Sequence, residues 1–403
     1  MEYWVILGLA TQAMKLIEVL SKSDEKAFIQ VHVIINENDP NWIRPLDKDV
    51  LSIFDPKLNK YLQNGEVIRW ILKEEDGKLI GRIAAFVNKR YKNKGDKFPV
   101  GGIGFFDCID NQNAANVLFD AAKSWLMQRG MQAMDGPINF GDRDKWWGLL
   151  TEGFHPPIYN MNFNPSYYQN LFEKYGFQTF YNQICWSLSI ASDSHQLDPK
   201  FYEAHQKYAG NPDFRAVHIL KSQLPKFAKD LSIVYNKAWA KHEGNKELSA
   251  QQALKLLQSM KPVLDEKLIW FVYHKDQPVV MWINLPDINQ IIKHLNGQFG
   301  IWSKIKFFFI KTFGKNSSFI GLVFGIVPEF QGSGLDYYMI VEAEKVIKST
   351  RSYKNLELYW QGDFNPKILN ISKNLGGKKS RNLITYRYLF DRNMSFERHP
   401  VLV

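Results

Sequence analysis

The same order of secondary-structure elements occurs twice along this chain, and that repetition constrains its fold more than any other feature. In the first half, two segments with alternating apolar residues flank Asp76-Gly77, a dipeptide typical of a β-hairpin turn. Apolar residues at helical spacing follow over Asn113–Arg129, and Gly130 ends that helix. The elements expected in this half are strands at Glu66–Lys73, Leu79–Val87, Val100–Ile109, Met131–Met134 and Phe177–Ile190, and helices at Glu25–Ile35, Asn113–Arg129 and Pro165–Tyr175.

The second half repeats this order. Its expected elements are strands at Leu268–His274, Pro278–Asn284, Phe319–Val327, Leu356–Trp360 and Leu383–Phe390, and helices at Pro225–Ala240, Ala250–Met260, Gly334–Lys348 and Pro366–Asn374. Two passes of hairpin, strand, helix, strand, helix and strand predict an α/β protein of the α+β kind. We expect two domains, each a mixed, mostly antiparallel sheet flanked by helices. We predict domains at residues 14–191 and 192–403, with the polar stretch Ser192–Pro199 as the linker.

The length of 403 residues also favours two domains, since one hydrophobic core seldom serves that many residues. Cys108 and Cys185 are the two cysteines and form no CxxC pair, so the sequence predicts neither a disulfide framework nor a metal site. The apolar stretch Tyr3–Ala10 is too short to span a bilayer, and we interpret the residues before Met14 as an upstream extension. With no other candidate for a transmembrane segment, we expect a cytoplasmic protein.

The formal net charge is +10 at pH 7, which favours an anionic partner such as a nucleotide cofactor, nucleic acid or a membrane surface. Many of the lysines are scattered over amphipathic segments. A solvated basic surface is therefore the simpler explanation of the charge, and we do not favour a nucleic-acid partner.

A glycine-rich turn precedes the helix expected at Gly334–Lys348. Its residues are Gln331-Gly332-Ser333-Gly334, followed by Leu335 and Asp336. Glycines allow close backbone approach, and the N–H groups at a helix N-terminus attract an anion. The turn resembles the loop [QR]-x-x-G-x-[GA] of the GNAT acyltransferases, which in that family holds the pyrophosphate of CoA.

This chain departs from the family loop at Asp336, which stands where the family has Gly or Ala. A carboxylate there would repel a pyrophosphate. Ser333 and Asp336 also fit a capping box, so a helix start without a ligand is an open alternative. The corresponding turn of the first half, Cys108–Asn113, contains no glycine, and we expect no CoA site in that half.

Two further segments, Asn164–Phe177 and Asn365–Gly377, resemble an Asn-led helix of the same family. Many GNAT enzymes carry a tyrosine on this helix that protonates the departing CoA thiolate. The matching positions here are Phe172 and Ser372. The usual acid is therefore absent from both halves.

A long loop follows the strand expected at Met131–Met134. Asp135–Leu150, with Glu152–Pro157 after it, resembles a group of uncharacterised bacterial GNAT-like proteins, and this resemblance covers most of the chain from Met14 on. A loop of this length with paired tryptophans usually binds a ligand or clamps two domains together. The predicted substrate-binding residues are Arg143, Trp146, Trp147, Glu152 and Asp363.

In the GNAT fold, the splayed fourth and fifth strands hold the pantetheine arm of CoA, which implies a role for Phe324–Val327 and Leu356–Trp360. Glu357 and Tyr359 lie on one face of the strand expected at Leu356–Trp360, because side chains alternate along a strand. We predict Glu357 as base and Tyr359 as replacement acid; the alternative is that both are exposed strand residues without a role. The predicted cofactor-binding residues are Ile326, Val327, Gln331, Gly332, Ser333, Gly334 and Asn365.

One segment of the second half interleaves lysines with large apolar residues. We expect an amphipathic helix packed on its own domain, and contact with a membrane surface or a partner is the open alternative. Its residues are Lys304, Ile305, Lys306, Phe307, Phe308, Phe309, Ile310, Lys311, Phe313 and Lys315.

Together these features predict an acyl-CoA-dependent N-acyltransferase that uses acetyl-CoA or another acyl-CoA as co-substrate. The expected acceptor is a small-molecule or peptide amine. Two alternatives stay open. A non-catalytic GNAT-like ligand-binding protein is favoured by Asp336, Phe172 and Ser372. A transferase that uses aminoacyl-tRNA is supported by the positive charge alone.

Overall fold

The computed structural model of the chain describes residues 2–5, 13–89, 91–141, 143–190, 197–240, 247–350 and 353–402. The elements up to residue 190 are β1 (Glu2–Val5), β2 (Met14–Glu18), α1 (Lys22–Asn36), α2 (Asp47–Ser52), β3 (Gly65–Glu74), β4 (Leu79–Asn88), β5 (Val100–Cys108), α3 (Gln112–Met127), β6 (Ala133–Gly136), β7 (Leu149–Glu152), α4 (Tyr168–Tyr175) and β8 (Gln178–Ser189).

The remaining elements are α5 (Pro199–Ala209), β9 (Phe214–His218), α6 (Leu224–Tyr235), α7 (Ala250–Met260), β10 (Ile269–His274), β11 (Gln277–Pro286), α8 (Asn289–Ile292), α9 (Ile301–Phe313), β12 (Ser318–Ile326), α10 (Leu335–Thr350), β13 (Asn355–Gly362), α11 (Pro366–Asn374) and β14 (Lys378–Leu389). The expected mixed, mostly antiparallel sheet flanked by helices is confirmed.

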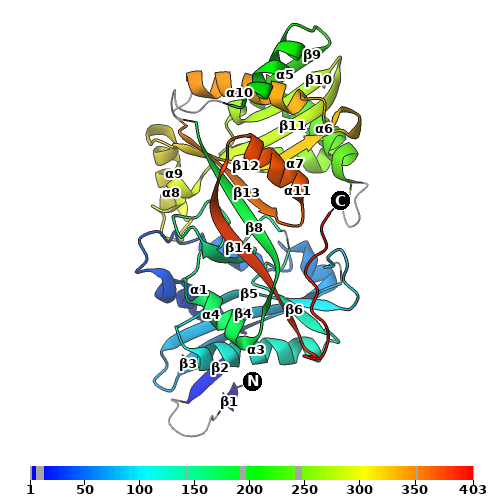
Figure 1. Cartoon of the computed structure of the whole chain (residues 1–403). Coiled ribbons are helices and arrows are strands. Elements are labelled where there is room, and N and C mark those ends of the chain that lie inside the picture. Colours follow the sequence, from blue (N-terminus) through cyan, green and yellow to red (C-terminus); the bar gives the residue numbers. More distant parts are fainter. Residues whose placement is uncertain are drawn as a thin grey trace.

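The two halves of the chain exchange their last strands. The strand order is β1-β2-β3-β4-β5-β6-β14-β8-β13-β12-β11-β10-β9. The C-terminal strand β14 pairs antiparallel with β6 of the first half, while β8 of the first half pairs antiparallel with β13 of the second. Figure 1 shows β8 and β14 crossing the middle of the molecule between the two groups of elements.

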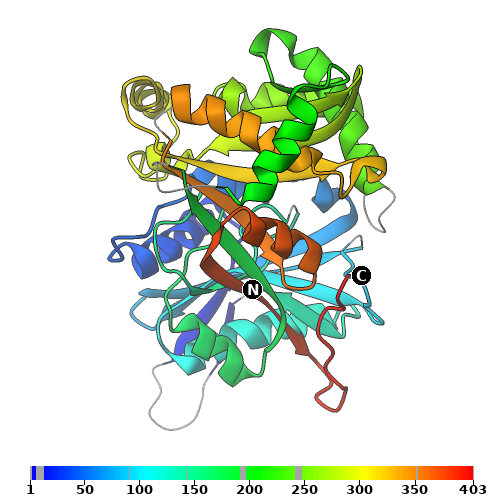
Figure 2. The ribbon, with the colours of Figure 1, turned by 45° about the horizontal axis from the view of Figure 1, so that its top comes forward.

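The predicted domain boundary stays a prediction, and residues 192–196 of the predicted linker lie outside the described residues. Each half has its own hydrophobic core. That of the first half is built largely on β3, β4, β5 and α3, and that of the second on β10, β11, α6 and α10. Figure 2 shows these helices lying against the sheet.

Each half also contains two parallel strands that pair briefly and then diverge. β5 pairs with β6 only over Val100–Gly102, although β5 runs on to Cys108. β12 pairs with β13 over Ser318–Gly321, although β12 runs on to Ile326. The antiparallel pair next to each divergence has a register shift. It lies between Arg82 and Ala84 of β4, which pairs with β5, and between Ile283 and Asn284 of β11, which pairs with β12. We call the gap between β12 and β13 the C-terminal opening, and that between β5 and β6 the N-terminal opening.

Helix ends follow their local sequences. Asn111 caps α3 by accepting a hydrogen bond from the Ala114 N–H, and Gly176 ends α4 with φ of 107°. The predicted helix at Ala250–Met260 is confirmed as α7, with a capping box formed by Ser249 and Gln252. The α4 helix begins at Tyr168, three residues later than predicted. Asn164 bonds the Leu150 backbone instead of starting a helix.

Among the described residues, no helix combines the length and the apolar character needed to cross a bilayer.

Candidate active site

The glycine turn before α10 is exposed and has the left-handed backbone that glycine favours. Gly332 has φ of +74° and Gly334 of +85°, and a Cβ added to Gly332 would meet no atom within 4 Å. Gln331 and Gly332 are exposed to solvent, and Ser333 is half-buried. The Ser333 hydroxyl donates to the Phe330 carbonyl at 2.6 Å, which fixes the turn against the preceding residues. The turn thus presents backbone N–H groups at the start of a 16-residue helix.

The first turn of α10 also holds Asp336, which is buried. Burial raises the pKa of this carboxyl, while hydrogen bonds from the N–H groups of Tyr337 and Asp336 itself lower it. The carboxyl therefore uses donors at the helix N-terminus that an anion would otherwise use.

The other predicted cofactor residues lie around the C-terminal opening. Ile326 pairs with Val280 across β11, and the buried Val327 donates its N–H to the Val279 carbonyl at 3.0 Å. Asn365 caps α11 through the Ile368 N–H at 3.4 Å.

Glu357 is held by a fully buried arginine. Arg381 donates from Nε to Glu357 Oε1 at 2.7 Å, and its other nitrogens donate to the carbonyls of His155 and Pro156 at 2.8 and 2.7 Å. Arg381 is only 1% exposed, so the Glu357 carboxylate balances its charge. The pair ties β13 and β14 to the long loop of the first half.

Tyr359 also connects β13 to the long loop. Its hydroxyl donates to the Asp144 carbonyl at 2.8 Å and lies 3.3 Å from that of Asn160. The next residue, Trp360, donates from Nε1 to the Arg143 carbonyl at 3.1 Å. Burial raises the pKa of Tyr359 well above its usual value. The diverging end of β13 is thus covered by the long loop.

The five predicted substrate-binding residues are dispersed. Arg143 donates to Asn93 at 3.0 Å, and the buried Trp147 donates to the Tyr181 hydroxyl at 2.9 Å. Glu152 forms a surface ion pair with Lys379 at 2.8 Å, and Asp363 pairs with Arg398 at 2.6 Å. Trp146 lines a pocket at the N-terminal opening.

We call this cavity the junction pocket, because residues from both halves line it. Its cavity volume is about 70 Å³, and about 810 Å³ of empty space lies in and beside it when open solvent is included. Its walls are mostly apolar or aromatic and come from the segment after α1, from β5 and from the long loop. They include Trp42, Leu46, Phe105, Phe106, Trp146, Tyr159, Met161 and Phe163, together with Asn289 of α8.

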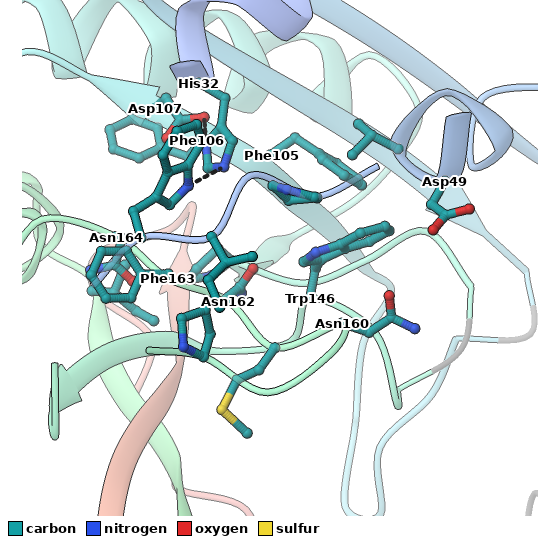
Figure 3. Close-up of a pocket in the computed structure, with 18 of the residues that line it drawn as sticks. His32, Asp49, Phe105, Phe106, Asp107, Trp146, Asn160, Asn162, Phe163 and Asn164 are labelled. Carbon is teal, nitrogen blue, oxygen red and sulfur yellow. Dashed lines mark hydrogen bonds and ion pairs between the residues drawn. The ribbon is translucent and has the colours of Figure 1, made fainter. Parts of the chain in front are cut away.

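Two polar groups lie at different ends of the junction pocket. Figure 3 shows His32 and Asp107 together on one side and Asp49 on the other, with Phe105 and Trp146 between them. Asp49 accepts a hydrogen bond from the Tyr159 hydroxyl at 2.8 Å. The pocket therefore combines aromatic walls with a polar group at each end.

His32 of α1 and Asp107 of β5 form a buried pair. His32 Nδ1 lies 3.0 Å from Asp107 Oδ2, and Trp42 donates from Nε1 to His32 Nε2 at 3.2 Å. Arg82 Nε also donates to Asp107, at 2.6 Å. Burial alone would raise the pKa of Asp107, but the charges of His32 and Arg82 and their hydrogen bonds lower it to about 2. A carboxylate bonded to Nδ1 leaves Nε2 as the basic nitrogen of the ring.

This pair was not predicted from the sequence. His32 lies in a predicted helix and Asp107 in a predicted strand, 75 residues apart, and neither belongs to a motif. The local signal was a polar residue at a core position in each element. A polar residue at a core position does not show which distant residue it pairs with.

Aromatic side chains fill the other face of the N-terminal opening. The Tyr168 hydroxyl accepts from the Cys108 N–H at 3.0 Å, and the Tyr167 hydroxyl donates to the Cys108 carbonyl at 2.8 Å. Phe172 packs on Phe106 and Phe119 with ring centroids 5.2 and 4.9 Å apart. These side chains occupy backbone groups that an extended ligand arm would use in an open pair of strands.

Asp287, at the end of β11, is the other unusual carboxyl near the junction. It accepts from the N–H groups of Tyr159 and Asn289 at 3.3 and 3.1 Å. Burial raises its pKa to about 7, against the opposing effect of these two hydrogen bonds.

We expect Asp287→Asn to stabilise the protein above pH 7. A carboxyl whose pKa is about 7 when folded, against an ordinary 3.8, contributes stability below pH 4 that is lost as the pH rises through 7. Asparagine keeps the accepting oxygen without the charge, so the gain at pH 8 should reach up to about 4 kcal/mol. Urea unfolding at pH 5 and pH 8 measures it. Equal stability changes at both pH values would show that Asp287 is ionised throughout.

Comparison with known proteins supports this architecture. No family model matches the chain. The Bacterial ceramide synthase of Caulobacter vibrioides is 27% identical over 383 residues, covering 93% of this chain and 96% of that protein. Protein YghO of Escherichia coli is 26% identical over 372 residues, covering 89% of this chain and 91% of that protein.

Two solved structures share the fold. The tandem GNAT protein from the clavulanic acid biosynthesis pathway has a TM-score of 0.53 at 9% identity, covering 93% of this chain and 98% of that one. The GCN5-related glucosamine N-acetyltransferase region of a fungal multi-domain β-N-acetylglucosaminidase has a TM-score of 0.54 at 12% identity. That match covers 95% of this chain but 39% of the fungal protein. With its two diverging strand pairs and its repeated element order, the chain is a protein of the tandem GNAT fold.

Proposed function

We propose that this protein is an acyl-CoA-dependent N-acyltransferase whose acceptor is a long-chain amine. The observation that carries the proposal is the C-terminal opening, where β12 and β13 stop pairing after Gly321 and Leu358 beside an exposed glycine turn. In this fold such an opening suits the extended arm of a CoA thioester, because the diverging strands leave backbone groups to bond it.

In this proposal the CoA pyrophosphate lies against Gln331, Gly332, Ser333 and Gly334, as the sequence predicts. Positive φ at both glycines and the open space beside Gly332 support it. The backbone near Ile326 and Val327 would contact the arm. The acyl group of the thioester would then lie near the start of the opening.

The acceptor is proposed to bind in the junction pocket. Aromatic walls suit a hydrocarbon chain, and polar groups at the two ends suit an amine and other polar substituents. The pocket adjoins β13, because the Asn160 carbonyl that lines it lies 3.3 Å from the Tyr359 hydroxyl. A ceramide is an N-acylated long-chain amine, so the name of the Caulobacter relative supports an acceptor of this class.

We assign the proton transfer to His32. Nε2 accepts the Trp42 indole N–H, so the acceptor ammonium would displace this hydrogen bond before Nε2 takes its proton. Loss of the proton frees the nitrogen lone pair to attack the thioester carbonyl. The new C–N bond forms as the C–S bond breaks, and the CoA thiolate leaves and takes up a proton. Asp107 orients the ring through Nδ1 and stabilises its charged form. Glu357 and Tyr359 remain the candidates predicted from the sequence, and both bond groups of the long loop.

Gly332→Ala tests the pyrophosphate site. A Cβ at φ of +74° strains the turn by about 1–2 kcal/mol and projects toward the proposed phosphate, so we expect acyl-CoA to bind about tenfold more weakly. Titration calorimetry with a long-chain acyl-CoA measures the affinity. Gly210→Ala is the matched control, because its Cβ would also meet open space and its backbone φ is −92°. Unchanged affinity in Gly332→Ala would rule out this turn as the phosphate site.

Asp336 favours a second candidate function, a binding protein without turnover. Its carboxyl bonds N–H groups of the first turn of α10 and opposes a second negative charge there. We expect Asp336→Asn to bind acyl-CoA roughly fivefold more tightly, because a nearby like charge is removed. Release of CoA by the native protein in the presence of a long-chain amine supports the enzyme. Tight acyl-CoA binding without any release supports the second candidate.

A further inference from the structure

The helix α9 leaves a large apolar surface exposed to solvent. Phe307 is buried and Ile310 half-buried, and these two pack on the rest of the molecule. Trp302 is 83% exposed, Ile301 76% and Phe313 73%. The exposed residues, which we call the α9 face, are Ile301, Trp302, Ile305, Phe308, Phe309 and Phe313.

The α9 face is one continuous side of the helix. Ile301, Ile305, Phe308, Phe309 and Phe313 follow the helical spacing of four, three, one and four residues, so at 100° per residue the face covers an arc of roughly 140°. Phe307 and Ile310 lie on the opposite side. The sequence predicts a helix packed on its own domain. Phe307 and Ile310 do pack on it, while the more apolar side of the helix is uncovered within the described residues. Figure 1 shows α9 at the margin of the molecule, beside α8.

Positive charge surrounds the α9 face. Between residues 288 and 328 the sequence contains five lysines and no aspartate or glutamate. On the helix, Lys306 lies at one edge of the face, and Lys304 and Lys311 lie at the other. Lys48 of α2 adds a further cation, with Nζ 3.8 Å from the centre of the Phe299 ring.

We propose that α9 is an interfacial helix that docks the protein on an anionic phospholipid bilayer. Six exposed apolar side chains would enter the acyl boundary, and the flanking lysines would meet the headgroups. At 13 residues the helix is too short to cross the hydrocarbon layer, so it lies in the plane of the interface. A protein partner would explain the apolar side chains. The helix itself carries lysines along both edges and no acidic residue, which matches a uniformly negative surface.

Docking through α9 would bring the junction pocket close to the membrane. Phe307 and Ile310 pack with Ile43 and Leu46, and Leu46 also lines the junction pocket. The hydrophobic cluster that packs against α9 therefore includes residues that line the junction pocket. The inference goes beyond the proposed acyl transfer and does not depend on it, because vesicle binding is measured without substrate.

Vesicle co-sedimentation of the full chain tests the proposal. We expect binding to vesicles of phosphatidylcholine with 30% phosphatidylglycerol, and much weaker binding to phosphatidylcholine alone. Trp302→Ser with Phe309→Ser should weaken the vesicle affinity by at least about tenfold, because two exposed aromatic side chains are removed. Lys304→Gln and Lys315→Gln should each weaken it roughly fivefold. High salt should reduce binding of the native protein.

The matched control is an exposed pair on another helix. Lys255→Gln and Leu256→Ser alter α7, where both side chains are exposed, and should leave vesicle binding unchanged. Circular dichroism checks that each variant is folded. Absence of vesicle binding would overturn the proposal, as would equal binding to neutral vesicles with no effect of the lysine changes. A lipid-free dimer that Trp302→Ser dissociates would show instead that a second copy covers the α9 face.

Discussion

His32→Ala should lower the rate of acyl transfer by about 10²–10⁴-fold while leaving the affinity for acyl-CoA unchanged. That range is the usual contribution of a positioned general base, and His32 lies in the junction pocket, away from the glycine turn of α10. The rate is measured as CoA release with a long-chain amine at saturating acyl-CoA. Calorimetry on the same variant gives the affinity for acyl-CoA.

Asp107→Asn tests whether His32 acts as a base or only forms a buried structural contact with Asp107. The amide can present its N–H₂ to Nδ1 and favour the wrong tautomer of His32, so the rate should fall and its pH profile should change. His294→Ala, which alters an exposed histidine, is the control and should leave the rate unchanged. If His32→Ala loses stability but keeps full activity, the pair is only a contact between α1 and β5. A larger rate loss in Glu357→Gln or Tyr359→Phe would return the assignment to the residues predicted from the sequence.

Arg387→Met should destabilise the protein by about 3–5 kcal/mol, because it leaves two buried carboxylates without a counter-charge. Arg387 on β14 donates from Nε and Nη2 to Asp135 at 2.6 and 2.8 Å, and its Nη1 lies 2.8 Å from Asp96. The side chains of Asp135 and Asp96 are at most 3% exposed. The expected loss is measured by urea unfolding at pH 7.5, followed by circular dichroism.

An exposed arginine provides the comparison. Arg129→Met removes a pair with Glu66 in which both side chains are substantially exposed, and such pairs contribute at most about 1 kcal/mol. The triple change Arg387→Met, Asp135→Asn, Asp96→Asn should recover part of the loss, since it removes the unpaired charges. If Arg387→Met unfolds at the same urea concentration as Arg129→Met, water must reach Asp135 and Asp96.

The sequence predicted the local elements well and the long-range pairing poorly. The hairpin around Asp76-Gly77 and the helix α7 follow from turn chemistry, capping and apolar spacing, all of which act within a few residues. The exchange of β8 and β14 could not be predicted. Both segments are apolar enough to fill either sheet, and their partners lie far away in the chain. The helix α5 and the strand β9 were not predicted from the sequence; β9 has only five residues.

The candidate site was likewise predicted only where its residues lie close together in the sequence. The glycine turn before α10 was found because its residues are adjacent and its chemistry is local. Glu357 and Tyr359 were chosen for their shared face on β13, but no pattern in the sequence indicated that Arg381 and the long loop would bond them. His32 and Asp107 were overlooked because a buried ionic pair formed across 75 residues appears in the sequence as two unrelated polar positions.

The position of β14 has a consequence for biosynthesis. Tyr386 pairs with Gly136, so the first sheet keeps an unfilled edge until the chain as far as β14 has left the ribosome. Contacts between residues so distant in the chain form slowly, and an unpaired strand edge invites association with other chains. Newly made protein should therefore depend on chaperones that shield β6, and its two halves should gain resistance to proteolysis together rather than in turn.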